Sequence, residues 1–119
     1  MAKRILVVDD ENEDLTTMRM ILEKQGYKVT TSSNGTKALG LLTKNGFDLI
    51  LIDIKMPSLS GYDLLRLLRE KINHDAKMVY VSIVPEKEVV MDDIDGFIQK
   101  PFSPESFLKG VKKVLGGKK

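Results

Sequence analysis

The chain has 119 residues, the length of one domain with a single hydrophobic core. Charged residues make up 30% and hydrophobic residues 42% of the sequence, and no apolar run approaches the roughly 20 residues that span a bilayer. The net charge of +2 is small and spread along the chain, so neither DNA nor a membrane is an expected partner. The absence of cysteine excludes disulfides and thiol chemistry and fits a cytoplasmic location, which we expect.

The first half of the chain alternates strand and helix patterns. An apolar run predicts a buried strand at 4–8, and apolar residues at helical spacing predict a helix at 12–25, with Gly26 as its C-terminal stop. A second strand at 27–31 and a second helix at 36–44 follow. Each strand is therefore followed by a helix.

The second half continues this alternation and ends in an amphipathic helix. It contains strand patterns at 47–53, 78–82 and 96–99 and helix patterns at 62–72 and 104–116. The last helix has the strongest start signals, because Ser103 is a favourable N-cap and Pro104 suits the first helical position.

The βα alternation predicts an α/β fold with a parallel sheet and helices on both faces. Strands that are apolar at every position support this class, because such strands are covered on both sides. In open α/β sheets the functional crevice lies at the carboxyl ends of the strands. The residues at predicted strand ends are Asp9, Asp10, Asp53, Ser82 and Lys100.

The acidic residues at these strand ends predict a cation site. Asp53 closes one apolar run, and Asp9 and Asp10 close another. Three carboxylates in one crevice repel each other unless a cation neutralises them, and hard divalent ions prefer oxygen ligands. Seen singly, each acid is as well explained as a helix cap or a turn residue.

Together, these residues resemble the receiver domain of two-component response regulators, over about 4–115. The shared motifs are the acidic pair, the aspartate after the third strand, the hydroxyl of Ser82, Met56-Pro57 with Gly61, and Lys100-Pro101. The resemblance implies a doubly wound five-stranded parallel sheet with the flavodoxin-like order 2-1-3-4-5. We expect residues 1–119 to form a single receiver domain without an output domain.

By the same resemblance, Asp53 is expected to attack a phosphoryl group from a histidine kinase or a small-molecule donor, forming an acyl phosphate. Asp10 and Asp53 are expected to bind Mg²⁺ directly, with the Lys55 carbonyl as a third ligand and Asp9 acting mainly through water. Mg²⁺ suits this set because it takes few protein oxygens and keeps waters beside phosphate.

The resemblance also assigns roles at the ends of the last two strands. Lys100 is expected to pair with the phosphoryl group, and a cis Lys100-Pro101 bond to direct it into the site. Ser82 is expected to turn its hydroxyl toward a phosphoryl oxygen, and Phe97 to change rotamer with it. A strand-end hydroxyl and a core aromatic are the simpler interpretations of these two residues. The only histidine, His74, is interpreted as a solvated loop residue.

Two departures from the family pattern concern residues around the site. Ile83 stands where the family has a small residue, so we expect it to narrow the approach of bulky phosphodonors. Lys55 and Val84 occupy the two variable positions that influence the lifetime of the acyl phosphate. Because Val84 cannot orient an attacking water, we expect slow autodephosphorylation.

A third departure is the short connection between Ser82 and Lys100. The segment 85–93 leaves room for about two helical turns, which is below the length of a stable isolated helix. We therefore expect a shortened fourth helix or an irregular loop there, and an output surface that differs from that of the family.

Three functions remain open from the sequence. The leading one is a stand-alone phosphoacceptor that signals through a phosphorylation-dependent protein-binding surface. Its downstream partner is unknown. The second is a phosphorylation-independent adaptor, suggested by Ile83 and the short segment. The third is an aspartyl-nucleophile phosphatase, although Lys55 stands where such enzymes carry a second Asp. A flavin module is disfavoured, because no Ser/Thr/Gly-rich phosphate loop follows the first strand.

Overall fold

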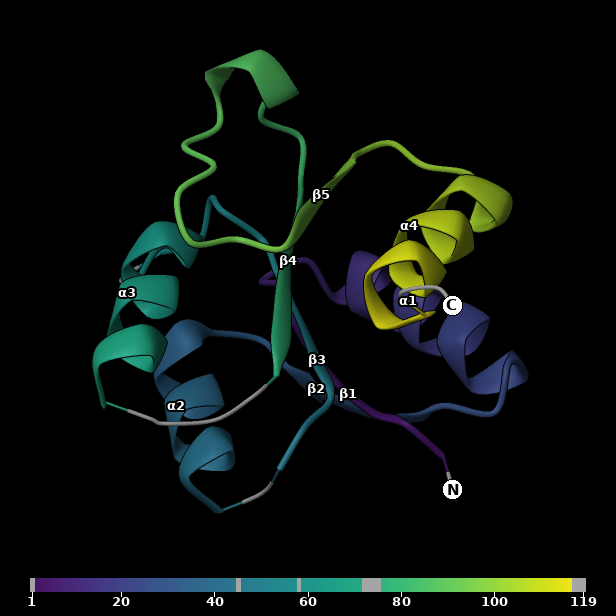
Figure 1. Cartoon of the computed structure of the whole chain (residues 1–119), viewed down its shortest axis with the longest axis horizontal. Helices are drawn as coiled ribbons and strands as arrows, with labels where there is room; N and C mark the ends of the chain where they lie inside the picture. The colour runs from purple at the N-terminus through teal and green to yellow at the C-terminus, as the bar shows by residue number, and fades with distance from the viewer. Residues whose placement is uncertain (1, 45, 58, 72–75, 117–119) are drawn as a thin grey trace.

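The computed structural model has the predicted doubly wound α/β architecture and describes residues 2–44, 46–57, 59–71 and 76–116. All pairings in its five-stranded sheet are parallel, and the strand order is β2-β1-β3-β4-β5 (Figure 1). The strands are β1 (Arg4–Val8), β2 (Lys28–Ser32), β3 (Leu49–Ile52), β4 (Lys77–Ser82) and β5 (Gly96–Gln99). The helices are α1 (Asn12–Lys24), α2 (Gly35–Lys44), α3 (Gly61–Lys71) and α4 (Pro104–Gly116).

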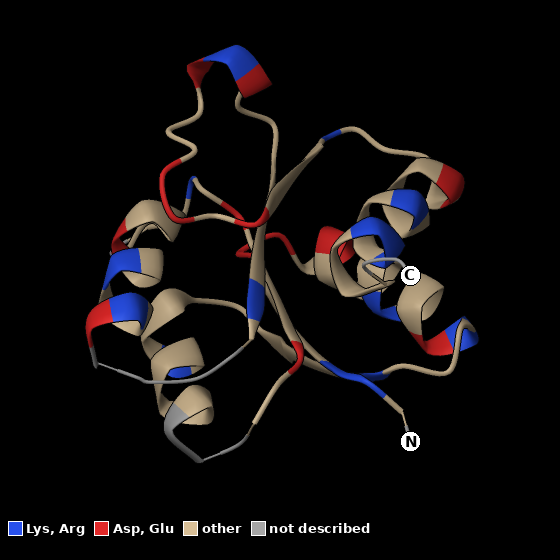
Figure 2. Cartoon of the chain, in the orientation of Figure 1, with Lys and Arg blue, Asp and Glu red and all other residues tan. Residues whose placement is uncertain are grey.

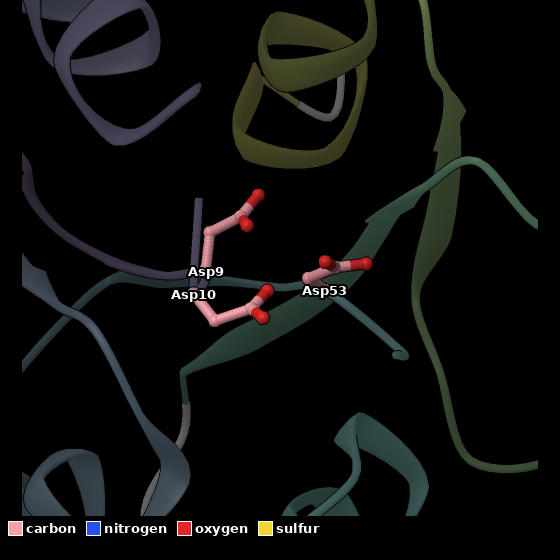
Figure 3. A group of neighbouring side chains, drawn as sticks. All are labelled: Asp9, Asp10 and Asp53. Carbon is pink, nitrogen blue, oxygen red and sulfur yellow. The ribbon is translucent and has the colours of Figure 1, made fainter. Parts of the chain in front are cut away.

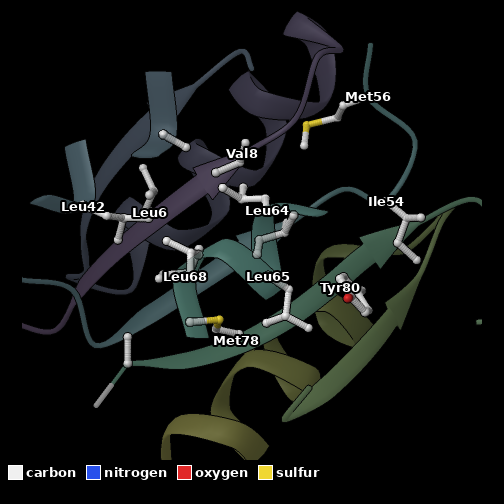
Figure 4. Packing of buried hydrophobic residues seen from close by; sticks show 14 of the residues in the cluster. Leu6, Val8, Leu42, Ile54, Met56, Leu64, Leu65, Leu68, Met78 and Tyr80 are labelled. Atoms are coloured by element: carbon white, nitrogen blue, oxygen red, sulfur yellow. The ribbon is translucent and has the colours of Figure 1, made fainter. Parts of the chain in front are cut away.

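Helices cover both faces of the sheet, α1 and α4 on one side and α2 and α3 on the other (Figure 1). Side chains alternate along a strand, so Ile5 and Val7 of β1 enter the core beneath α1 and α4, and Leu6 and Val8 enter the other. Figure 4 shows this second core, in which Leu6 and Val8 pack with Leu64, Leu68 and Met78. The two cores explain why β1 and β3 are apolar at consecutive positions.

Local signals in the sequence correctly predicted two helix ends. The Ser103 hydroxyl accepts the Ser106 N–H at 3.0 Å, and the Ser106 hydroxyl accepts the Ser103 N–H at 3.0 Å. These reciprocal bonds satisfy N–H groups that have no partner within the helix. Gly26 has φ 90° after α1, a conformation that favours glycine.

Several predicted boundaries differ from the observed ones. The third strand was predicted at 47–53, but β3 begins at Leu49 and ends at Ile52, with Asp53 immediately beyond it. Compared with the predictions, β2 is displaced by one residue toward the C-terminus, α1 ends one residue earlier, and α2 and β4 each begin one residue earlier. The third helix begins at Gly61 rather than at 62, and residue 72, its predicted end, lies outside the described residues, as does His74.

The connection between β4 and β5 confirms the prediction of a shortened helix. It contains one turn of 3₁₀-helix, η1 (Glu86–Glu88), and extends beyond the carboxyl ends of the strands (Figure 1). Val89 is the buried residue that follows this turn, and it packs into the core beneath α2 and α3. The side of the sheet near β5 therefore has no α-helix in this connection.

Candidate functional site

The carboxyl ends of β1 and β3 bring three acidic residues together. These strands are neighbours, and the Asp53 N–H donates to the Val8 carbonyl at 2.9 Å, which continues their pairing by one residue. Carboxylate oxygens of Asp9, Asp10 and Asp53 all lie within 4.8 Å of one another (Figure 3). The strand-end argument from the sequence therefore places these side chains correctly.

Gly61 lets the loop after Asp53 fold back tightly against the end of β3. Its N–H donates to the Ile54 carbonyl at 2.8 Å. A Cβ at this position would lie 2.8 Å from the Ile54 Cα, too close for any other residue without movement of the backbone. The glycine that follows Met56-Pro57 in the sequence thus has a packing reason.

Asp9 is the most perturbed acid of the cluster. It is fully buried, and burial raises its pKa to about 6 from the ordinary 3.8, with the charge of Asp53 adding to the rise. Hydrogen bonds from the Lys100 ammonium and from the Glu11 N–H act in the opposite direction and lower this pKa.

In Figure 2 acidic positions lie near the strand ends in the centre of the view, while both signs of charge are interspersed on the helices.

Lys100 is the cation of this site. Its Nζ lies 2.6 Å from Asp9 Oδ2 and 3.8 Å from Asp53 Oδ2. The Lys100-Pro101 peptide bond is cis, as expected, and the Lys100 N–H donates to the Ser82 carbonyl at 2.9 Å. Burial acts to lower the pKa of Lys100, but hydrogen bonds with Asp14 and Asp9 outweigh it and raise that pKa, so the ammonium stays charged.

Asp14 is a site residue that the sequence reasoning missed. It lies in the first turn of α1, and its Oδ2 accepts a hydrogen bond from Lys100 Nζ at 2.7 Å. An acid in the first turn is ordinarily explained by the helix dipole alone. The two residues are 86 positions apart, so no local signal could have paired them.

Gln99 was also missed, although it connects the β4–β5 segment to the site. Its side-chain amide donates to the carbonyls of Ser82 at 3.0 Å and Val84 at 3.1 Å, and its Oε1 accepts the Glu86 N–H at 3.1 Å. A glutamine at the end of a strand gives no such signal in the sequence.

Ser82 and Phe97 lie where the sequence placed them, at the end of β4 and in β5. The buried Ser82 accepts the Val84 N–H on its hydroxyl oxygen at 3.4 Å, a long bond that leaves the hydroxyl able to turn. Phe97 is paired beside Tyr80 and packs, half-buried, against the core beneath α2 and α3. Their switching roles stay predictions.

The positions at which this chain departs from the family pattern lie on the surface near the ends of β3 and β4. Lys55 and Val84 line one open cleft of about 660 Å³, together with Met56, Pro57 and other residues of the loop after β3. Ile83 is 65% exposed, so the core does not hold its side chain in place. The Lys55 carbonyl as a metal ligand also stays a prediction.

The chemistry of the acidic cluster fits Mg²⁺. Three carboxylates offer hard oxygen donors, and the exposed Asp10 leaves one side of the cluster open to water. Mg²⁺ favours such sites, because it takes few protein oxygens and retains several waters.

Comparisons with known proteins agree with this geometry. The strand order and the acidic site define the CheY-like class of flavodoxin-like α/β proteins. Residues 5–112 match the family model of the response regulator receiver domain. The chain therefore belongs to the response regulator receiver domain family, whose members are phosphoacceptor signalling domains of two-component systems.

Individual relatives are moderately similar. The response regulator SaeR of Staphylococcus aureus is 31% identical over 116 residues, covering 93% of this chain and 50% of SaeR, so the chain spans about half the length of these curated relatives. CheY4 of Vibrio cholerae is 28% identical with a TM-score of 0.89, covering 97% of this chain and 100% of CheY4. TrrA of Thermotoga maritima, solved with Mg(2+)-BeF, is 32% identical with a TM-score of 0.86, covering 95% and 99%.

None of the helices in the described parts of the chain combines the length and apolar character needed to span a membrane.

Proposed function

We propose that this domain accepts a phosphoryl group on Asp53 from a histidine kinase, with Mg²⁺, and that the phosphorylated form binds another protein differently. The observation that carries this proposal is the convergence of Asp9, Asp10 and Asp53 within 4.8 Å, with Lys100 Nζ 3.8 Å from the Asp53 carboxylate. In this proposal the nucleophile Asp53, the acidic metal ligands and the positive charge of Lys100 lie together at the carboxyl ends of the strands.

The reaction transfers the phosphoryl group from the donor to the Asp53 carboxylate. A carboxylate oxygen of Asp53 forms a bond to phosphorus, and the bond from phosphorus to the donor's nitrogen or oxygen breaks. The donor atom keeps the electron pair and takes up a proton. The Lys100 ammonium compensates the negative charge that the phosphoryl oxygens bring to Asp53, and the Ser82 hydroxyl donates to one of them.

Asp10, Asp53 and the Lys55 carbonyl would hold Mg²⁺, and Asp9 would contribute mainly through water. The ion, when bound, offsets negative charge on the transferring phosphoryl group. Within residues 1–119 we infer a single receiver domain, working in the cytoplasm, whose output is contact with another protein.

Intact-mass measurement with phosphoramidate or acetyl phosphate, with and without Mg²⁺, tests the proposal. We expect one added phosphoryl group that requires Mg²⁺ and is absent from Asp53→Asn, a near-isosteric control that lacks the nucleophilic oxygen. No addition to the wild type or to Ile83→Ala with any donor, including a histidine-phosphorylated kinase, would rule the proposal out.

A second candidate is the phosphorylation-independent adaptor, which the single 3₁₀ turn at Glu86–Glu88 favours. Ile83→Ala distinguishes the two if the wild-type protein does not react. Recovered labelling would show that Ile83 blocks the donor, whereas an inert Ile83→Ala protein would support the adaptor.

A further inference from the structure

The Lys100 ammonium is held by two carboxylates, and neither is the proposed phosphoacceptor. Its Nζ lies 2.6 Å from Asp9 Oδ2 and 2.7 Å from Asp14 Oδ2, but 3.8 Å from Asp53 Oδ2. Only the first two distances are those of hydrogen bonds. Two of the three ammonium protons are therefore directed away from Asp53.

The two carboxylates differ in how firmly they are fixed. Asp9 is fully buried, and its second oxygen accepts the Glu11 N–H at 2.9 Å. The Asp14 side chain is 38% exposed, so its carboxylate can exchange Lys100 for water with little loss of solvation. Asp14 is therefore the partner that Lys100 can give up.

Asp14 also has a reason to lie at the strand ends. Side chains in a helix tilt toward its N-terminus, and Asp14 is in the first turn of α1, which starts directly after the acidic pair. The buried Leu15 next to it anchors this turn against the core beneath α1 and α4. The first turn of α1 thus presents Asp14 to Lys100.

We propose that Asp14 is a positioning residue that restrains Lys100 away from Asp53 until the phosphoryl group arrives. This inference rests on the proposed phosphorylation of Asp53. A phosphoryl group brings on the order of two negative charges and three acceptor oxygens, which makes it a stronger partner for Lys100 than a half-exposed carboxylate. Lys100 then exchanges Asp14 for the phosphoryl group and retains Asp9.

The Asp14–Lys100 ion pair is weak enough for the phosphoryl group to displace and strong enough to change the phosphorylation rate measurably. A partly exposed ion pair changes an equilibrium by at most about fivefold. Removing the Asp14 charge is therefore expected to speed phosphorylation by a small-molecule donor by about two- to fivefold.

The test compares Asp14→Asn with Glu13→Gln, in the full chain with Mg²⁺ and phosphoramidate. Both substitutions remove one negative charge from the first turn of α1, and Glu13 is exposed. The initial rate of phosphoryl addition, followed by intact mass, is expected to rise in Asp14→Asn only. Asp14→Glu, which restores a carboxylate, is expected to return the rate toward that of the wild type.

A second readout follows the contact without phosphorylation. The ¹³Cε chemical shift of Lys100 is expected to change in Asp14→Asn and to remain that of the wild type in Glu13→Gln. A moved resonance with an unchanged or slower rate would overturn the restraint and leave the proposed function intact. An unmoved resonance would overturn the contact itself. If no variant gains a phosphoryl group, the proposed function fails and this inference fails with it.

Discussion

Asp9 is fully buried at the end of β1, and burial raises its pKa to about 6 from the ordinary 3.8. Between these two values the folded protein holds a proton that the unfolded chain has lost. The free energy of unfolding of the Mg²⁺-free protein is therefore expected to fall as the pH rises from about 4 to about 6. The contribution of Asp9 is fully present below this window and lost above it.

Asp9→Asn is expected to remove this fall, because an amide does not titrate. At pH 7 the variant should be more stable than the wild type by up to about 3 kcal/mol, and near pH 4 the two should be equal. Urea denaturation in EDTA at several pH values measures this. Glu13→Gln serves as the exposed control and should keep the wild-type slope. If the free energy of unfolding of Asp9→Asn still fell with pH as in the wild type, another group would be its cause.

At the scale of single elements, α4 depends on a local cap. Ser103 and Ser106 exchange two hydrogen bonds at 3.0 Å between side chain and backbone. Ser103→Ala removes one acceptor and is expected to lower the free energy of unfolding by about 1 kcal/mol. Chemical denaturation measures the change, and a loss of only a few tenths would mean that water replaces the cap.

The β4–β5 connection depends on Gln99 rather than on a helix. The Gln99 side chain bonds the Ser82 and Val84 carbonyls and the Glu86 N–H. Gln99→Ala is expected to speed hydrogen exchange across 85–93 about tenfold, for roughly 1.4 kcal/mol of lost hydrogen bonding. Exchange in β4 should not change, because its ladder is formed by backbone groups and does not use the Gln99 side chain.

Lys87→Ala is the control for this measurement, since Lys87 is an exposed residue of η1 in the same segment. Equal exchange in both variants would mean that Gln99 does not fix the segment.

The elements themselves were largely predictable, because their signals are local. Continuous apolar runs identified β1 and β3, and Ser103-Pro104 identified the start of α4. The end of β3 was misplaced, because periodicity does not show where ladder pairing stops. The contact of Asp14 with Lys100 was not predictable, since it depends on how α1 packs beside the end of β5. Sequence therefore predicts the acidic cluster through strand ends, but not the partners that approach it from helices.

At the scale of the whole molecule, the acidic cluster connects cation binding to stability. Asp9, Asp10 and Asp53 repel one another in the Mg²⁺-free protein, and a cation that binds only the folded state stabilises it by mass action. At a Mg²⁺ concentration of about one hundred times the Kd, the gain is about 2.7 kcal/mol. For a domain of this size, that corresponds to a rise in Tm of roughly 10 °C.

Asp10→Asn is expected to abolish most of this rise, because it removes a proposed Mg²⁺ ligand on the exposed side of the cluster. Glu13→Gln removes the same charge from a residue outside the cluster and should keep the full rise. Thermal denaturation with increasing Mg²⁺ compares the two variants with the wild type. An equal rise in all three would place the bound cation elsewhere on the molecule, and the Mg²⁺ site proposed at the strand ends would then be wrong.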